Sequence, residues 1–210
     1  QIYIIPMKNL HITRLLAFLL VTMWLWSSCG DGKFDTAVDK GVSTYSSEAS
    51  LSWNLLFLDI ERYAAGYRPG PAPRALGLMG FAAYEACLPG MSEYNDLAPL
   101  YAGLSVPAAE NAEYHWPTVV NAVYGYMMPR FFATMNSSFL QKIATLESAN
   151  EVKFKAETST EIFERSKQRG IAVAKAVWDW STNDPWGHDS YVNPFGNYVW
   201  QDHYDGPGDW

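Results

Sequence analysis

Apolar residues recur at helical spacing in five stretches of the chain, whereas no stretch shows the strict alternation of a half-buried strand. In the first stretch, Trp53, Phe57 and Ile60 fall on one face of a helix that Gly66 ends. The five predicted helices cover residues 48–65, 73–88, 116–131, 138–149 and 159–181. Together they predict an all-α fold, a helical bundle whose domain spans residues 51–182.

Prolines and glycines separate the predicted helices. The stretch 67–73 contains three prolines, which prevent helix until the second helix begins. Residues 91–114 are irregular, with at most one helical turn at 97–101. Pro129 lies inside the third helix and is expected to kink it.

The last segment, residues 183–210, combines glycine, proline, asparagine and aromatic residues without a period of either kind. A compact domain rarely ends on an irregular stretch of this length. We therefore interpret this segment as a bridge into a missing catalytic half, and we expect the chain to be truncated after Trp210.

The N-terminus has the pattern of an export signal, which we assign to residues 1–28 with 1–6 as an upstream extension. Basic residues precede an apolar run at 15–26, which is short of the roughly 20 residues that span a bilayer. Two serines then stand directly before Cys29, as a lipoprotein signal peptidase requires. We predict a lipid on Cys29. An ordinary cleaved signal that happens to contain a cysteine is the alternative.

Residues 29–50 are polar and predict a lipidated tether that holds the domain off the membrane surface. The chain has 15 basic and 22 acidic residues and a net charge of −7, which argues against nucleic-acid binding. The same acidity leaves the lipid, and not electrostatic attraction, as the membrane attachment. We expect an exported protein, anchored in the periplasm or at the outer membrane.

The second cysteine and the histidines offer little chemistry. If Cys29 carries lipid, Cys87 has no disulfide partner, and its small, apolar surroundings predict a buried free thiol. His188 and His203 stand among aspartates, but 15 residues apart in an irregular segment, so loop capping is a better interpretation than a metal site. His115 is most simply a residue at the start of a helix.

The densest mixed-charge cluster combines residues of the first predicted helix with the connector after it. Its members are Asp59, Glu61, Arg62, Arg68 and Arg74, and Tyr84-Glu85 of the second helix could reach them. Two carboxylates facing one cleft would allow acid–base chemistry. Arginine–carboxylate pairing between the first two helices explains the same residues more simply. Charges on the last helix, Arg169 among them, are expected to form a solvated side.

Several segments of the sequence resemble a known family. They are residues 55–63, 66–76, 82–86, 89–91, 178–184 and 191–195. These segments are similar to the N-terminal half of bacterial vanadium-dependent haloperoxidase-like proteins, which belong with the type 2 phosphatidic acid phosphatases. The resemblance extends over about 52–210, and its motifs are helix-packing residues.

The resemblance implies a mostly helical enzyme whose active site lies in its second half. Such a parent would bind vanadate and oxidise halide with peroxide, or would hydrolyse phosphate esters, since vanadate has the geometry of a phosphoryl-transfer transition state. Three motifs build the family's site: Lys with Arg-Pro seven residues later, Ser-Gly-His, and Arg with His six residues later.

None of the three motifs occurs in this chain. Glu61 stands seven residues before Arg68-Pro69, and Trp186 precedes Gly187-His188. We therefore predict no catalytic, cofactor-binding or metal residue here, and interpret the chain as the non-catalytic part of such an enzyme. The alternative is a non-enzymatic helical surface lipoprotein that binds glycans, which nine Trp and thirteen Tyr would also suit.

Overall fold

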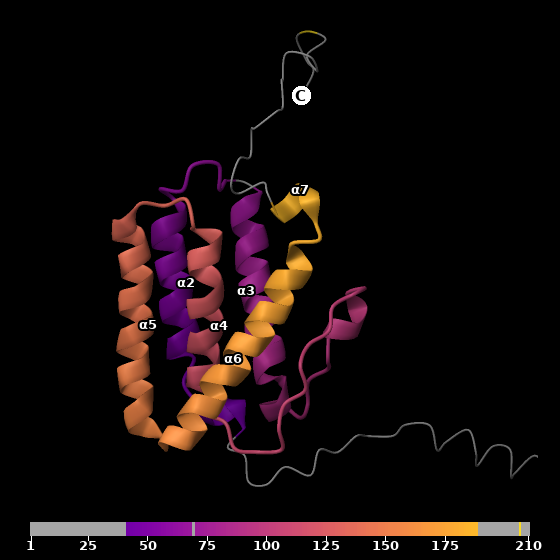
Figure 1. Cartoon of the computed structure of the whole chain (residues 1–210), viewed down its shortest axis with the longest axis vertical. Coiled ribbons are helices and arrows are strands. Elements are labelled where there is room, and N and C mark those ends of the chain that lie inside the picture. The colour runs from indigo at the N-terminus through magenta and orange to yellow at the C-terminus, as the bar shows by residue number, and fades with distance from the viewer. Residues whose placement is uncertain (1–40, 69, 189–205, 207–210) are drawn as a thin grey trace, which may run out of the picture. The chain divides into compact units, whose positions relative to one another are not determined.

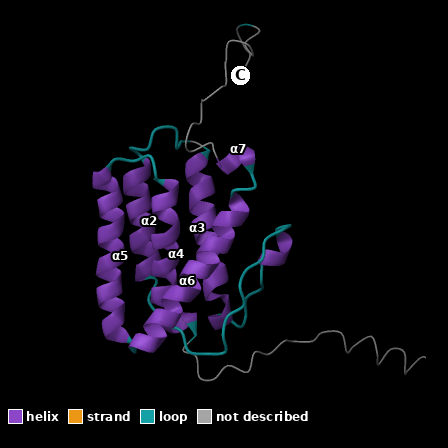
Figure 2. Cartoon of the chain, in the orientation of Figure 1, coloured by secondary structure: helices purple, strands orange, loops and turns teal. Residues whose placement is uncertain are grey.

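The computed structural model describes residues 41–68, 70–188 and 206, and this part of the chain is helical with no strand (Figure 2). Its elements are η1 (Val42–Thr44), α2 (Glu48–Glu61), α3 (Pro71–Cys87), η2 (Leu88–Gly90), η3 (Ala98–Leu100), α4 (Trp116–Phe131), α5 (Ser137–Glu157), α6 (Thr160–Ser181) and α7 (Pro185–His188). The predicted all-α fold is confirmed.

Helix α4 is the centre of the bundle. It contacts α2, α3, α5 and α6, and residues around its whole circumference are buried, as expected for a helix enclosed by others. Figure 1 shows α2, α3, α4 and α5 running alongside one another, with α6 crossing them obliquely. The crossing depends on Gly170 of α6, because a Cβ there would lie 2.7 Å from the Cβ of Ala122.

Aromatic side chains fill the core where the helices meet α4. Trp53 of α2 stacks on Tyr124 with ring centroids 5.9 Å apart. Phe131 at the end of α4 meets Trp178 of α6 edge-on at 5.0 Å. Fully burying one such side chain contributes about 1.5–3 kcal/mol, so these contacts are main determinants of stability.

The structure moves several predicted helix boundaries. Helices α4 and α6 lie within a residue of the prediction, whereas α2 ends at Glu61 and not at residue 65. Helix α5 continues to Glu157, eight residues beyond the predicted end. The prediction stopped early because only Ile143 and Phe154 of α5 are buried, so apolar residues do not recur at helical spacing over its last turns. Pro129 lies inside α4, which continues past it to Phe131.

The structure also differs from the predicted tether and bridge where each of them meets the helical domain. Val42 and Tyr45 pack against the core and Ala49 is buried, so the folded domain begins before residue 51. The predicted irregular segment from residue 183 starts with the single helical turn α7. There, the Asp184 carboxylate accepts a hydrogen bond from the Gly187 backbone N–H at 3.0 Å. The predicted signal peptide, Cys29 and His203 lie outside the described residues.

Candidate functional site

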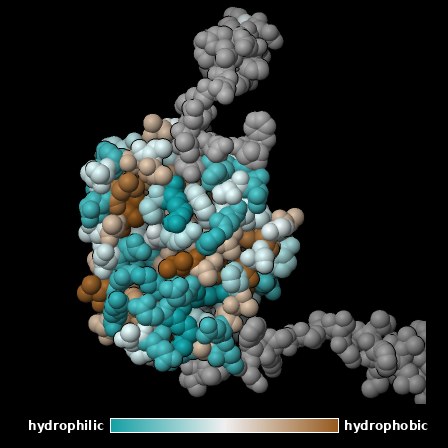
Figure 3. Space-filling model, in the orientation of Figure 1, coloured by the Kyte–Doolittle hydropathy of each residue, from teal (hydrophilic) through white to brown (hydrophobic). Residues whose placement is uncertain are grey.

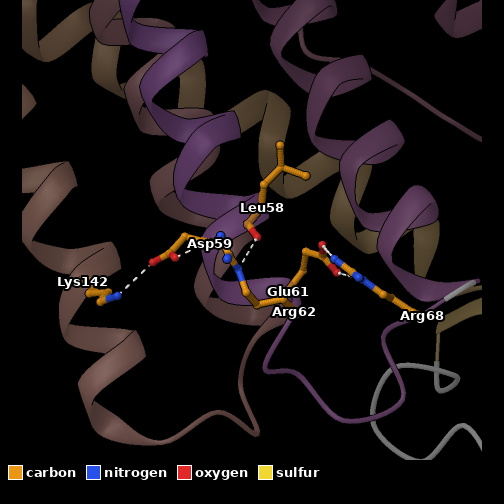
Figure 4. Close-up of polar contacts among 6 residues, drawn as sticks. All are labelled: Leu58, Asp59, Glu61, Arg62, Arg68 and Lys142. Atoms are coloured by element: carbon orange, nitrogen blue, oxygen red, sulfur yellow. Dashed lines mark hydrogen bonds and ion pairs between the residues drawn. The ribbon is translucent and has the colours of Figure 1, made fainter.

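The mixed-charge cluster contains one bidentate ion pair, between the last residue of α2 and the connector to α3 (Figure 4). Arg68 donates through Nε to Glu61 Oε2 at 2.8 Å and through Nη2 to the other carboxylate oxygen. The guanidinium holds the pKa of Glu61 below its usual range, although the carboxylate is buried. A carboxylate held ionised in this way does not serve as a general acid.

Asp59 faces a different neighbour. Its carboxylate accepts a hydrogen bond from Lys142 of α5 at 2.9 Å and lies 3.3 Å from Arg62. The bond from Lys142 lowers the pKa of Asp59. In Figure 4 Asp59 and Glu61 point to opposite sides, toward Lys142 and Arg68 respectively. The two carboxylates therefore do not share a cleft. The predicted pairing between the first two helices is therefore wrong, because Glu61 pairs with Arg68 of the connector and Asp59 pairs with Lys142 of α5.

Arg74 does not belong to this cluster, contrary to the prediction. Its Nη2 donates to the backbone carbonyl of Ser181 at 3.0 Å and to the Asp184 carboxylate at 3.4 Å. The contact ties the start of α3 to the end of α6, where a cation is favoured by the unpaired carbonyls of a helix C-terminus.

Glu85 is also separate from the cluster. It is buried in α3, where one carboxylate oxygen accepts a hydrogen bond from the Leu97 backbone N–H at 3.0 Å. Desolvation raises the pKa of Glu85. The Tyr84 hydroxyl donates to the Asn95 carbonyl at 2.6 Å. Both side chains thus hold the irregular segment after η2 against α3.

Arg169 is buried, contrary to the solvated position expected from its sequence. It donates to the carbonyls of Ala86 at 3.3 Å and Glu85 at 3.1 Å, which end α3, and to the carbonyl of Pro107. Desolvation lowers the pKa of Arg169. The guanidinium satisfies carbonyls that the end of α3 leaves without helical partners, and it fastens the 91–115 segment to the bundle.

A second arrangement missed by the sequence is a polar network between α2, α4 and α5. Asn121 accepts hydrogen bonds from Trp53 Nε1 and Asn150 Nδ2, both at 2.9 Å. The Glu147 side chain lies against Gly125, where a Cβ would be 2.6 Å from its carboxylate carbon. Burial raises the pKa of Glu147. The sequence offered one signal for this network, since Asn121 is a polar residue within the otherwise apolar third predicted helix.

His115 and Cys87 lie where the sequence predicted, at the start of a helix and in the core respectively. His115 stands at the N-cap position of α4, with Nδ1 at 2.8 Å from the Thr118 hydroxyl. His188 ends α7 and meets the Trp178 ring edge-on at 5.2 Å. Cys87 is buried, and desolvation raises the pKa of its thiol to about 12. Within the described residues no group of His, Cys, Asp and Glu could hold a metal ion.

Comparison with known proteins finds no matching family model, curated protein or solved structure. In the part of the chain that the structure describes, no helix is both long enough and apolar enough to cross a bilayer. On the face drawn in Figure 3, apolar residues form small separate patches among polar ones. Most of the carboxylates and cations described above join elements of the fold.

Proposed function

We propose that this chain is the non-catalytic N-terminal part of an exported vanadium-dependent haloperoxidase-like enzyme. The observation that carries the proposal is the contact from Arg74 to Ser181, which lie 107 residues apart. Arg74 belongs to segment 66–76 of the family resemblance, and Ser181 belongs to segment 178–184. The direct hydrogen bond between the two segments supports the view that both belong to one family pattern. Two chance similarities would not be expected to lie in contact.

The arrangement of cations supports a structural role for this part. A vanadate cradle needs cationic donors that converge on one oxyanion. Arg68, Arg74 and Arg169 instead donate to acceptors within the protein at three separate places. The described residues do not fit vanadate, so the proposal puts vanadate and catalysis in the second half of the parent. This chain would supply the helical frame on which that half is built.

The first experiment is to read the coding sequence beyond codon 210. A continuing frame that encodes Lys-x6-Arg-Pro, Ser-Gly-His and Arg-x5-His is the expected result. A stop codon at that point in the natural gene would contradict the proposal. As a second measurement, the purified chain should not brominate a phenol-red substrate with vanadate, peroxide and bromide, and activity by this chain alone would overturn its non-catalytic role.

The proposal includes export and a lipid on Cys29. Cells expressing the chain should incorporate radiolabelled palmitate into it, and Cys29→Ser should abolish the label. Cys87→Ser is the matched control and should keep the label, because the Cys87 thiol is buried in the core. Equal labelling of wild type and Cys29→Ser would exclude the lipid anchor.

A non-enzymatic surface lipoprotein that binds glycans is the second candidate, and one observation favours it. Tyr101 is 41% exposed, lies 5.4 Å from the ring of Trp180 and 4.9 Å from that of Phe81. Exposed aromatic rings can stack on sugars. Retarded migration of the chain in gels containing polysaccharide, lost in Tyr101→Ala, would favour this candidate over the enzyme.

A further inference from the structure

Helix α2 is apolar on two opposite faces. Trp53, Phe57 and Ile60 face the core and are at most 1% exposed. The opposite face carries an outer stripe, which consists of Leu51, Leu55 and Leu58 with exposed fractions of 56%, 58% and 49%. Single exposed leucines are ordinary on protein surfaces. Three of them spaced by four and three residues form the seam that a helix uses against a second helix.

Residues of opposite charge flank the two ends of the outer stripe. Glu48 and Arg62 stand seven residues before and seven residues after Leu55, which places both on the same side of α2 as the stripe. Glu48 begins the helix and Arg62 follows its last residue. In Figure 4 Arg62 and Leu58 come from neighbouring turns, and Arg62 Nε lies 3.4 Å from the Leu58 carbonyl oxygen.

Charged residues next to Glu48 and Arg62 leave the first end of the stripe acidic and the second end basic. At one end Lys153 pairs with Glu48 at 2.7 Å and also interacts electrostatically with the carboxylate of Glu157. These three side chains together carry a net negative charge. At the other end Asp59 is shared by Arg62 and Lys142, so the group is net basic. A helix with one acidic and one basic end is complementary to an antiparallel copy of itself.

We propose that a second copy of this chain docks on the outer stripe, with the two α2 helices antiparallel and Leu55 near the two-fold axis. This arrangement puts Glu48 opposite the partner's Arg62, twice, as a self-complementary interface requires. It also aligns the helix dipoles favourably. A parallel pairing would place like charges together at both ends.

The interface should be weak. Helix α2 has 14 residues and is therefore about 21 Å long. One helix pair of this length buries less than the about 800 Å² per partner of a standard interface. We expect a concentration-dependent dimer with a dissociation constant in the micromolar range. The inference goes beyond the proposed function and does not depend on it, because it uses only residues of α2 and their neighbours.

The test is a charge reversal that is repaired only between two chains. Sedimentation velocity of the full chain in non-ionic detergent should show a monomer–dimer equilibrium. Glu48→Arg and Arg62→Glu should each raise the dissociation constant about tenfold or more, since both ends become repulsive. An equal mixture of these two variants should dimerise at least as well as wild type, because every end then pairs opposite charges.

Glu93→Arg is the matched control, since Glu93 is exposed in the segment after η2 and lies off the stripe. It should leave the dissociation constant unchanged within about twofold. A monomer at every concentration would overturn the proposal and would leave the stripe to a lipid surface or to another part of a longer protein. Single variants that dimerise like wild type, or a mixture no better than its components, would overturn it equally.

A covalent measurement covers the case in which a charge variant fails to fold. Under mild oxidation Leu55→Cys should give a disulfide-linked dimer, because the two positions meet at the axis. Val152→Cys on α5, where Val152 is 74% exposed, should not. Equal cross-linking of both variants, or of neither, would contradict docking on the stripe.

Discussion

Gly170 is the position at which a single added carbon should test the packing of the bundle. It lies where α6 packs directly on the backbone of α4. In Gly170→Ala the new Cβ would be 2.7 Å from the Cβ of Ala122 and closer still to the carbonyl oxygen of Val119. Neither neighbour is the end of a flexible side chain, so relief requires the two helices to move apart.

Two opposing effects determine the size of the change. Alanine is favoured over glycine inside a helix by about 1 kcal/mol, and this gain applies to any helical glycine of the chain. Overpacking a core costs about 1–3 kcal/mol, and rigid neighbours favour the upper end. We therefore expect Gly170→Ala to lower the free energy of unfolding by about 2 kcal/mol.

Gly80 of α3 is the matched control, because a Cβ there would meet nothing within 4 Å. Gly80→Ala should raise the free energy of unfolding by up to about 1 kcal/mol. Urea unfolding followed by circular dichroism measures both variants against wild type, with the denaturant slope unchanged. If Gly170→Ala proves as stable as Gly80→Ala, the close approach of α6 to α4 is refuted.

Three further predictions concern side chains that are buried or partly buried. Arg169→Met should lower the free energy of unfolding by about 3 kcal/mol in urea, because it leaves backbone carbonyls unsatisfied, and limited proteolysis should then cut within residues 91–115. An unchanged cleavage pattern would argue against the role of Arg169 in holding this segment to the bundle. Burial raises the pKa of Glu147 in the fold, so its ionisation costs stability as pH rises above the ordinary value of 4.5. Glu147→Gln should therefore be more stable than wild type at neutral pH and equal to it near pH 4, which urea midpoints at both values would check. Cys87 should react with a thiol reagent only after unfolding, and rapid labelling of the native chain would contradict its burial.

Local signals account for the helices that the sequence located well. Ser159 caps α6 by accepting a hydrogen bond from the Ile162 backbone N–H at 3.2 Å, and Pro117 stands in the first turn of α4. Such signals act within one turn and can be read directly from the chain. Helix α5 lacks an apolar period over its last turns, where Phe154 alone is buried, and its end was therefore missed.

The partners of the charged residues could not be predicted in the same way. The sequence shows that Arg74 and Arg169 are cations, but not which carbonyls the helix ends leave unpaired. Arg74 meets Ser181 across 107 residues and Arg169 meets Ala86 across 83. These pairings depend on how α6 crosses the bundle, and close packing at Gly170 permits that crossing.

The sequence by itself determined that this protein is all-α, because helical periodicity and capping are local properties of the chain. It also shows that the three catalytic motifs expected of the proposed parent enzyme are absent from residues 1–210. Only the tertiary structure decided that the carboxylates of the charged cluster are separate and that Arg169 is buried. The same is true of α2: sequence shows apolar residues around the helix, and packing alone decides which of its two faces is left exposed.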